Sequence, residues 1–375
     1  MRKIYALLLF CLTTILSYGQ MNERTLSDQA IVSVITCGTG DQLYSLFGHT
    51  AIRIYDPIER IDRVYNYGMF DFRAPNFYGK FVKGDLLYFA TYDSYRDFVM
   101  NYMYDDRAVY EQVLNLTQQQ KQKVFDELST SLLEENKYYV YKFIDQNCTT
   151  KVVDILNKVI PTPVKVDVEG NTTTYRTILN SYLKSRYFEM LGINLIFGSK
   201  VNKESNLLFL PDKFMLGLAE TKINNQPLVS ETIDVFVPQN NKQGIWWDTM
   251  WFASVIALFF AVAVVNSFVR KTFLFLLGLL GLFFFGVAFY SLHSELLWNN
   301  SILLCSPLFL LLPFVKKEYT WRGKYNLAVI VSVLAFTVVN IVSQKLFVSL
   351  PLVLLTYFAV ALEFQLINIV RVKKE

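Results

Sequence analysis

Two hydrophobic patterns divide the chain near residue 245. Before this point, short runs in which apolar and polar residues alternate are interrupted by glycine, proline and charged residues. After it, Leu, Phe, Val and Ile dominate. Short alternating runs are typical of strands in a globular domain, whereas long apolar runs are typical of membrane-spanning helices. We therefore expect a globular domain over residues 20–245 and a membrane domain over residues 246–375.

Five apolar runs make up the membrane part, and each is near the length that crosses a bilayer. They cover residues 249–269, 272–292, 296–315, 325–343 and 347–370. The third run is short and contains Pro307 and Pro313, which a membrane helix tolerates when its neighbours satisfy the freed carbonyls. The expected unit is an all-α five-helix transmembrane bundle.

Basic residues at alternate ends of these runs predict the orientation. Arg270 and Lys271 follow the first run, four basic residues separate the third run from the fourth, and three more lie at the tail. Loops rich in Lys and Arg remain in the cytoplasm. The sequence therefore predicts a multi-pass protein of the cytoplasmic (inner) membrane with a cytoplasmic C-terminus and an external, periplasmic globular domain. Glu363, in the last run, is expected to pair with the basic tail.

The first 19 residues agree with this orientation because they have the pattern of a signal peptide. A basic start is followed by an apolar stretch, with small residues at Ser17 and Gly19. Cys11 lies within the apolar stretch and lacks the preceding small residue of a lipoprotein box. We expect residues 1–19 to be removed on export.

Within the globular part, both periodicities are present, so the expected class is α+β. The predicted strands cover residues 30–36, 50–55, 63–67, 86–92 and 108–116. The predicted helices cover residues 117–135, 148–159 and 173–191. Thr117 with Gln120 predicts a capping box at the start of the first helix.

Cys148 is the first candidate for chemistry because it begins a predicted helix behind Asn147, a good helix cap. A helix N-terminus favours a thiolate, and its unpaired N–H groups, including that of Thr149, can stabilise an oxyanion. The alternative is a buried structural thiol. The polar residues on both sides of Cys148 favour the reactive interpretation.

His49 is the candidate base, since the chain has only 2 histidines and this one begins a predicted strand after Gly48. A base needs a group that orients its ring. Asn66 lies on the adjacent predicted strand and is the preferred orienting residue, with Asp71 as the fallback. The alternative for His49 alone is an ordinary core or surface histidine.

Three cysteines remain after the signal peptide, namely Cys37, Cys148 and Cys305. Because exported thiols tend to pair, a disulfide between Cys37 and Cys148 is the alternative to a free nucleophile. Such a bond would silence Cys148. A free Cys148 is the preferred interpretation.

The second histidine, His293, lies in a connection on the same side of the membrane as the globular domain, followed by Asn299 and Asn300. Polar groups at this depth often serve function, so these three residues are candidates for positioning a substrate near the thiol. Ordinary interface anchoring is the alternative.

Composition restricts the remaining functions. The chain is 53% hydrophobic with a formal charge of +4, and many basic residues mark topology, so nucleic acid is not indicated as a partner. No His or Cys spacing suits a metal, and no phosphate-binding glycine loop accompanies Gly38 and Gly40, so no cofactor is expected.

Three motifs carry a family resemblance. They are Tyr44-Ser45-Leu46-Phe47-Gly48-His49-Thr50, Tyr65-Asn66-Tyr67-Gly68 and Asp145-Gln146-Asn147-Cys148-Thr149-Thr150. With the five apolar runs, they make nearly the whole mature chain resemble the Lnb-type bacterial lipoprotein N-acyltransferases. The order of His before Cys is also similar to circularly permuted papain-like acyltransferases.

The resemblance implies a papain-like thiol domain followed by a five-helix membrane domain. It implies that Cys148 is the nucleophile and His49 the base. In the third position this chain has Asn66 where histidine is more familiar, and Tyr44 is a candidate supporting residue. It also implies an acyl transfer from a membrane phospholipid, through a thioester, to the α-amino group of a diacylglyceryl-cysteine lipoprotein. Two alternatives remain: a membrane-anchored cell-wall peptidase or amidase with the same thiol pair, and a non-enzymatic lipid-binding or assembly protein.

Overall fold

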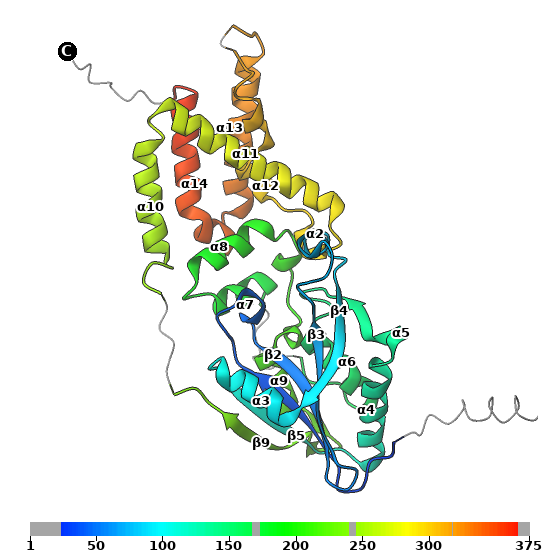
Figure 1. The fold of residues 1–375 in the computed structure, drawn as a ribbon. Coiled ribbons are helices and arrows are strands. Elements are labelled where there is room, and N and C mark those ends of the chain that lie inside the picture. Colours follow the sequence, from blue (N-terminus) through cyan, green and yellow to red (C-terminus); the bar gives the residue numbers. More distant parts are fainter. Residues whose placement is uncertain (1–23, 167–172, 240–244, 317, 367–375) are drawn as a thin grey trace, which may run out of the picture.

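The computed structural model describes residues 24–166, 173–239, 245–316 and 318–366, and shows a sheet domain next to a set of apolar helices (Figure 1). The predicted signal peptide, residues 1–19, lies outside the described residues, as does the junction at 240–244.

The sheet has seven antiparallel strands in the order β6-β4-β3-β2-β1-β5-β9. The strands are β1 (Ile31–Cys37), β2 (His49–Asp56), β3 (Ile61–Met69), β4 (Leu87–Ser94), β5 (Val109–Leu114), β6 (Tyr138–Val140) and β9 (Val229–Phe236). The five predicted strands are confirmed, whereas β6 and β9 at the two edges were not predicted. A separate hairpin pairs β7 (Lys222–Ile223) with β8 (Gln226–Pro227).

Eight helices accompany the sheet in the described residues. They are α2 (Phe77–Lys83), α3 (Tyr95–Tyr104), α4 (Gln118–Ser131), α5 (Glu134–Lys137), α6 (Cys148–Val159), α7 (Tyr175–Tyr182), α8 (Tyr187–Ile196) and α9 (Pro211–Glu220). The predicted helix at 148–159 is confirmed with the same bounds. The predicted helix at 173–191 is instead two helices, because Asp248 accepts hydrogen bonds from the N–H groups of Tyr187 and Phe188 and so starts α8 separately.

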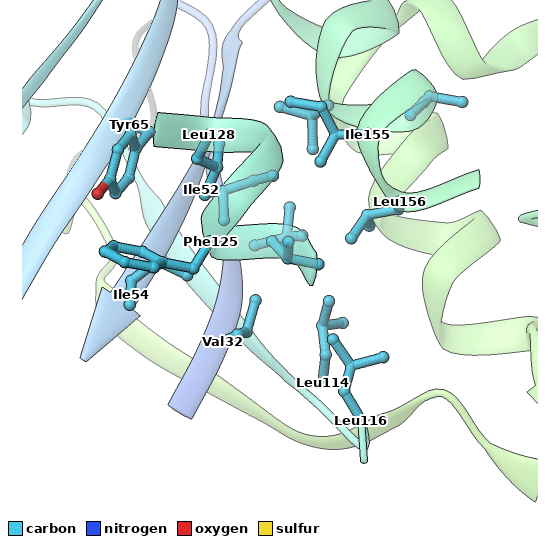
Figure 2. Packing of buried hydrophobic residues seen from close by; sticks show 14 of the residues in the cluster. Val32, Ile52, Ile54, Tyr65, Leu114, Leu116, Phe125, Leu128, Ile155 and Leu156 are labelled. Carbon is cyan, nitrogen blue, oxygen red and sulfur yellow. The ribbon is translucent and has the colours of Figure 1, made fainter. Parts of the chain in front are cut away.

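The main core lies where α4 and α6 cover one face of the sheet (Figure 2). Val32, Ile52 and Ile54 point from β1 and β2 toward Phe125 and Leu156, which lie on the two helices. Each fully buried side chain of this size contributes about 2 kcal/mol of burial free energy. On the opposite face, α3 packs against β1, β2 and β3 through a smaller cluster. The sheet and α6 are thus held rigidly with respect to each other.

The apolar part contains three helices that are long and apolar enough to cross a membrane, among the residues that the structure describes. They are α11 (Ser267–Tyr290), α13 (Arg322–Asn340) and α14 (Gln344–Glu363). The first predicted run forms only α10 (Met250–Ala263), and the third forms the short α12 (Ser301–Leu304) and the 3₁₀ helix η5 (Pro307–Leu311). Five helices of spanning length are therefore not observed; residues 367–370 of the last run lie outside the described residues.

Two local features explain the shorter segments. Asn266 accepts hydrogen bonds from the N–H groups of Phe268 and Val269, so a new helix starts where the first run was expected to continue. In the third run, Pro307 has no N–H and begins a 3₁₀ turn that packs on α11.

Basic residues gather at the end of the apolar part that is remote from the sheet domain. Arg270, Lys271, Lys316 and Arg322 line a cavity of about 810 Å³ there. Glu363 pairs with Arg270 at 2.8 Å, and the basic tail with which it was expected to pair lies outside the described residues. The positions of these residues agree with the charge asymmetry read from the sequence.

Candidate active site

The N-terminus of α6 is fixed by a complete capping box, which confirms the predicted cap. Asn147 Oδ1 accepts from the Thr150 N–H at 2.9 Å, and Thr150 Oγ1 accepts from the Asn147 N–H at 2.9 Å. Asn147 Nδ2 also donates to the carbonyls of Phe143 and Phe209, at 2.9 and 2.8 Å. Both donor hydrogens of this amide are used in these bonds, so its role is to hold the helix start in place.

Cys148 follows the cap directly and is 9% exposed. Burial alone would raise the pKa of its thiol, but the charge of His49 and a hydrogen bond with that ring lower the pKa to about 7. The Thr50 backbone and the Thr149 hydroxyl contribute in the same direction. The site therefore favours the thiolate near neutral pH.

The same contact affects the imidazole. Burial lowers the pKa of His49, but the charge of Cys148 and hydrogen bonds with Cys148 and Asn66 raise the pKa above its ordinary value. The two groups stabilise each other as a thiolate–imidazolium pair. His49 Nε2 lies 3.1 Å from Asn66 Oδ1, which leaves Nδ1 as the ring nitrogen for the thiol.

Asn66 is in turn fixed by a carboxylate that sequence reasoning missed. Its Nδ2 donates to Asp93 Oδ2 at 2.7 Å, so its carbonyl oxygen must face the ring. His49, Asn66 and Asp93 come from the adjacent strands β2, β3 and β4. Because Asn66 presents an acceptor oxygen to the ring, Nε2 must carry a proton. In the neutral ring Nδ1 is then the basic nitrogen, which is the tautomer that accepts a thiol proton.

The residue after Cys148 ties the start of α6 to the sheet. Thr149 is fully buried, and its hydroxyl lies 3.1 Å from that of Thr50 on β2, tying the helix start to the strand of His49. A helix N-terminus leaves the first N–H groups, here those of Cys148 and Thr149, without intrahelical partners. They are the candidate oxyanion donors.

Cys37, Cys148 and Cys305 are all free and buried. Cys37 lies opposite His49 in the β1–β2 register, but no disulfide joins it to Cys148. Burial raises the pKa of Cys37, so this thiol is protonated and unreactive near neutral pH. Only Cys148 combines a lowered pKa with a base.

Two predicted supporting residues lie away from the thiol. Asp71 makes its side-chain hydrogen bonds with Arg73 at the surface, so the fallback orienting residue is not used. Tyr44 is 63% exposed and packs edge-on against Phe70. Of the two candidate orienting residues, Asn66 is the one that contacts the His49 ring.

The three polar residues proposed for substrate positioning are engaged by the protein itself. His293 Nε2 lies 2.9 Å from the Phe81 carbonyl oxygen. Asn299 Nδ2 donates to the carbonyls of Leu195 and Ile196. The side-chain oxygens of Asn299 and Asn300 both accept hydrogen bonds from Lys345 Nζ. These contacts connect the apolar helices to the sheet domain.

Glu295 is the residue of this connection that reaches the Cys148 loop. It is 1% exposed, and its Oε1 accepts from the Ile144 N–H at 3.1 Å. Its Oε2 is buried without a hydrogen-bond partner among the described residues. The sequence did not predict a role for Glu295, because the hydrophobic pattern does not show which side chain of a connecting segment is buried against the sheet domain.

Comparison with known protein families gives a match over the residues that form this site. Residues 18–181 match the family model described as the Lnb N-terminal periplasmic domain. This part of the chain is similar to the N-terminal domain of the Lnb family. The predicted resemblance is confirmed over these residues, which include His49, Asn66, Asp93 and Cys148. A search of curated proteins and a search of solved structures found no match.

The match ends within α7, so α8, α9 and the apolar helices lie beyond it. The matched region therefore contains Cys148, His49, Asn66 and Asp93. It also contacts the apolar helices, because α2 lies against α11 and Asn180 Nδ2 donates to Gln344 Oε1 of α14. The description of the family places the matched domain in the periplasm, in agreement with the predicted orientation.

Proposed function

We propose that this protein is a lipoprotein N-acyltransferase that uses Cys148 as its nucleophile. The observation that carries the proposal is the chain of contacts from Cys148 through His49 and Asn66 to Asp93, at the start of a capped helix. The match to the Lnb family and the attached apolar helices support a lipid substrate. The arrangement of a helix-borne Cys and a strand-borne His is also the basis for proposing a circularly permuted papain-like fold.

In the first half-reaction, His49 Nδ1 accepts the thiol proton and Cys148 Sγ attacks the ester carbonyl of a membrane phospholipid. The oxyanion of the tetrahedral intermediate lies at the N–H groups of Cys148 and Thr149. The carbon–oxygen bond breaks, and His49 returns the proton to the departing alkoxide. The products are a lysophospholipid and a thioester on Cys148.

In the second half-reaction, the neutral α-amine of a diacylglyceryl-cysteine lipoprotein attacks the thioester carbon. A carbon–nitrogen bond forms, the carbon–sulfur bond breaks, and His49 transfers the amine proton to the sulfur. Both substrates are anchored in the outer leaflet of the inner membrane, so the apolar helices bring the thiol to the place where they meet. We infer that α10 and the α12–η5 segment complete this membrane unit around the three spanning helices, with the basic end in the cytoplasm.

A cell-wall peptidase or amidase with the same thiol pair is the second candidate, since the geometry suits acyl chemistry on either substrate. The apolar helices favour the lipid. A peptidase that acts on a soluble polymer needs a single anchor, whereas here the chain has three helices of spanning length, of which α14 bonds Asn180 and the Phe197 carbonyl and α11 lies against α2. A non-enzymatic role is less well supported, because the lowered pKa of Cys148 and the oriented base serve no purpose in it.

The test is intact-mass analysis of a reporter lipoprotein in cells that rely on this protein for N-acylation. The wild-type protein is expected to add one acyl chain, and Cys148→Ala and His49→Ala to add none. Cys305→Ala is the matched control, because it removes a free, buried thiol remote from His49, and it should keep full N-acylation.

Full N-acylation by Cys148→Ala in a strain without another acyltransferase would contradict the proposal. Release of peptidoglycan fragments that depends on Cys148, together with an unmodified reporter, would favour the peptidase.

A further inference from the structure

The connection between β3 and β4 carries an unusual surface. Three aromatic side chains project from it into open space: Phe72, Tyr78 and Phe81 are 62%, 78% and 45% exposed, and together we call them the aromatic lip. The helix in this connection, α2, has no buried residue. A seven-residue helix is not stable by itself, and exposed aromatic clusters mark surfaces that something covers.

The position of α2 indicates what covers it. The Leu292 N–H donates to the Lys83 carbonyl at 2.7 Å, and His293 Nε2 contacts the Phe81 carbonyl. These bonds attach α2 to the chain just after α11 ends at Tyr290, at the end of this spanning helix that faces the sheet domain (Figure 1). The aromatic lip therefore lies beside the end of a helix that is long and apolar enough to cross a membrane.

The chemistry of the segment agrees with a lipid surface. Aromatic rings prefer the boundary between headgroups and acyl chains, and nearby cations contact phosphates. Arg73, whose side chain is 90% exposed, and Lys80 lie in the same connection. Exposed apolar rings, adjacent cations and continuity with a spanning helix together favour the outer leaflet over a protein partner.

A continuous row of aromatic rings leads from the aromatic lip to the thiol. The ring centroids of Phe70 and Phe72 are 4.8 Å apart, those of Phe70 and Tyr88 5.3 Å, and those of Tyr88 and Tyr141 4.5 Å. Tyr141 in turn borders Gly68, where an added Cβ would lie 3.3 Å from the Tyr141 ring and 3.7 Å from Cys148 Cβ.

We propose that the aromatic lip inserts into the outer leaflet and that the row of rings from Phe70 to Tyr141 guides the acyl chain of the donor lipid to Cys148. This inference deepens the proposed function, and its second part rests on that function. The ligand class is the acyl chain of a glycerophospholipid. Gly68, with φ of +83°, keeps the last step of the path free of a side chain.

The first experiment measures insertion alone and does not depend on activity. Tyr78→Cys is made in the full-length Cys148→Ala protein, labelled with a polarity-sensitive fluorophore and placed in phospholipid nanodiscs. Lipids that carry a nitroxide near the headgroup should quench this label. Tyr104→Cys is the matched control, because Tyr104 is 92% exposed at the end of α3, far from α11, and its label should remain unquenched (Figure 1). Equal quenching at the two positions would overturn the proposed insertion.

The second experiment measures delivery of the lipid. The double variant Phe72→Ser/Tyr78→Ser should raise the KM for phospholipid about tenfold with little change in kcat, since only partition into the leaflet is weakened. Iodoacetamide should still alkylate Cys148 at the wild-type rate, and Tyr104→Ser should behave as wild type. An unchanged KM would overturn the role of the aromatic lip. A wild-type protein without N-acyltransferase activity would contradict the proposed function, while the quenching result would still decide insertion.

Discussion

The reactivity of Cys148 depends on one neighbour more than on its helix. Burial raises the pKa of the thiol, and the contact with His49 reverses this effect and brings the pKa to about 7. The thiolate should therefore persist down to about pH 7 and be lost below it, as the sulfur takes up a proton. The raised pKa of His49 keeps the imidazolium partner charged above its ordinary range.

Alkylation of Cys148 by iodoacetamide, followed by peptide mass analysis across pH, should show this pair. In the wild type, the rate should reach half its maximum near pH 7. In His49→Ala, the remaining burial should move the half-point upward by more than one pH unit and slow the reaction at pH 7 about tenfold. Identical profiles for the two proteins would show that His49 does not set the pKa.

The second prediction at this scale concerns Asn66 and Asp93. Asn66→Ala removes the acceptor of the Nε2–H bond, so the ring loses both its orientation and its tautomer, and kcat should fall about 10²-fold. Asp93→Asn leaves Asn66 in place but allows its amide to turn, and kcat should fall about tenfold. Steady-state transfer to the reporter lipoprotein measures both effects.

Asp62→Asn is the control, because Asp62 is also a carboxylate of this sheet, on β3, and its partner is Arg53. It should leave kcat unchanged. Wild-type kcat in Asp93→Asn would mean that Asp93 does not orient the amide.

At the scale of elements, two capping boxes of the same kind have different tasks. Thr117 and Gln120 cap α4 at the surface, whereas Asn147 and Thr150 cap α6 at the thiol. Thr117→Ala should lower the free energy of unfolding by about 1 kcal/mol without affecting Cys148. Asn147→Ala should cost more, about 2–3 kcal/mol, because the carbonyls of Phe143 and Phe209 also lose their donor.

Thermal unfolding in detergent and the alkylation profile of Cys148 separate these effects. Asn147→Ala should raise the pKa of the thiol because the helix start frays, and Thr117→Ala should not. Equal profiles in the two variants would show that the helix N-terminus contributes little to the thiolate.

The elements that the sequence predicted well are those with local signals. The strand of His49 alternates cleanly, and Asn147 with Pro161 delimits α6 on both sides. The edge strand β9 was missed because five of its eight residues are exposed and it pairs with β5 across more than a hundred residues. Asp93 was missed because its contact with Asn66 depends on the register between β3 and β4. This register includes an irregularity between Asn66 and Met69 and cannot be read from composition.

At the scale of the whole molecule, buried polar bonds rather than a loose tether connect the two parts. Lys345, at the start of α14, is 1% exposed and donates to Asn299 and Asn300. Arg176 from α7 and Lys345 both contact the Phe197 carbonyl at the end of α8. Such bonds are expensive to break once buried, so the membrane helices and the thiol domain should move as one unit.

Glu295 provides the most direct test of this coupling, because it bonds the Ile144 N–H just before the nucleophile. Glu295→Gln keeps the acceptor oxygen and removes a buried charge, so N-acyl transfer should persist and the unfolding temperature should stay equal or rise. Glu295→Ala leaves the Ile144 N–H buried without a partner, which costs about 1–3 kcal/mol and loosens the Cys148 loop. Its transfer rate in nanodiscs should fall about tenfold or more.

The comparison of the two Glu295 variants separates hydrogen bonding from charge. If only the bond to Ile144 matters, Gln should behave as wild type and Ala should be impaired. If Gln is as impaired as Ala, the negative charge itself is required, and Oε2, which is buried and has no hydrogen-bond partner in the described part of the chain, becomes a candidate contact for the cationic α-amine of the acceptor before it loses its proton. The transfer rate as a function of acceptor concentration then decides the matter, because loss of an amine contact raises the KM for the lipoprotein, whereas a loosened loop lowers kcat at saturating acceptor.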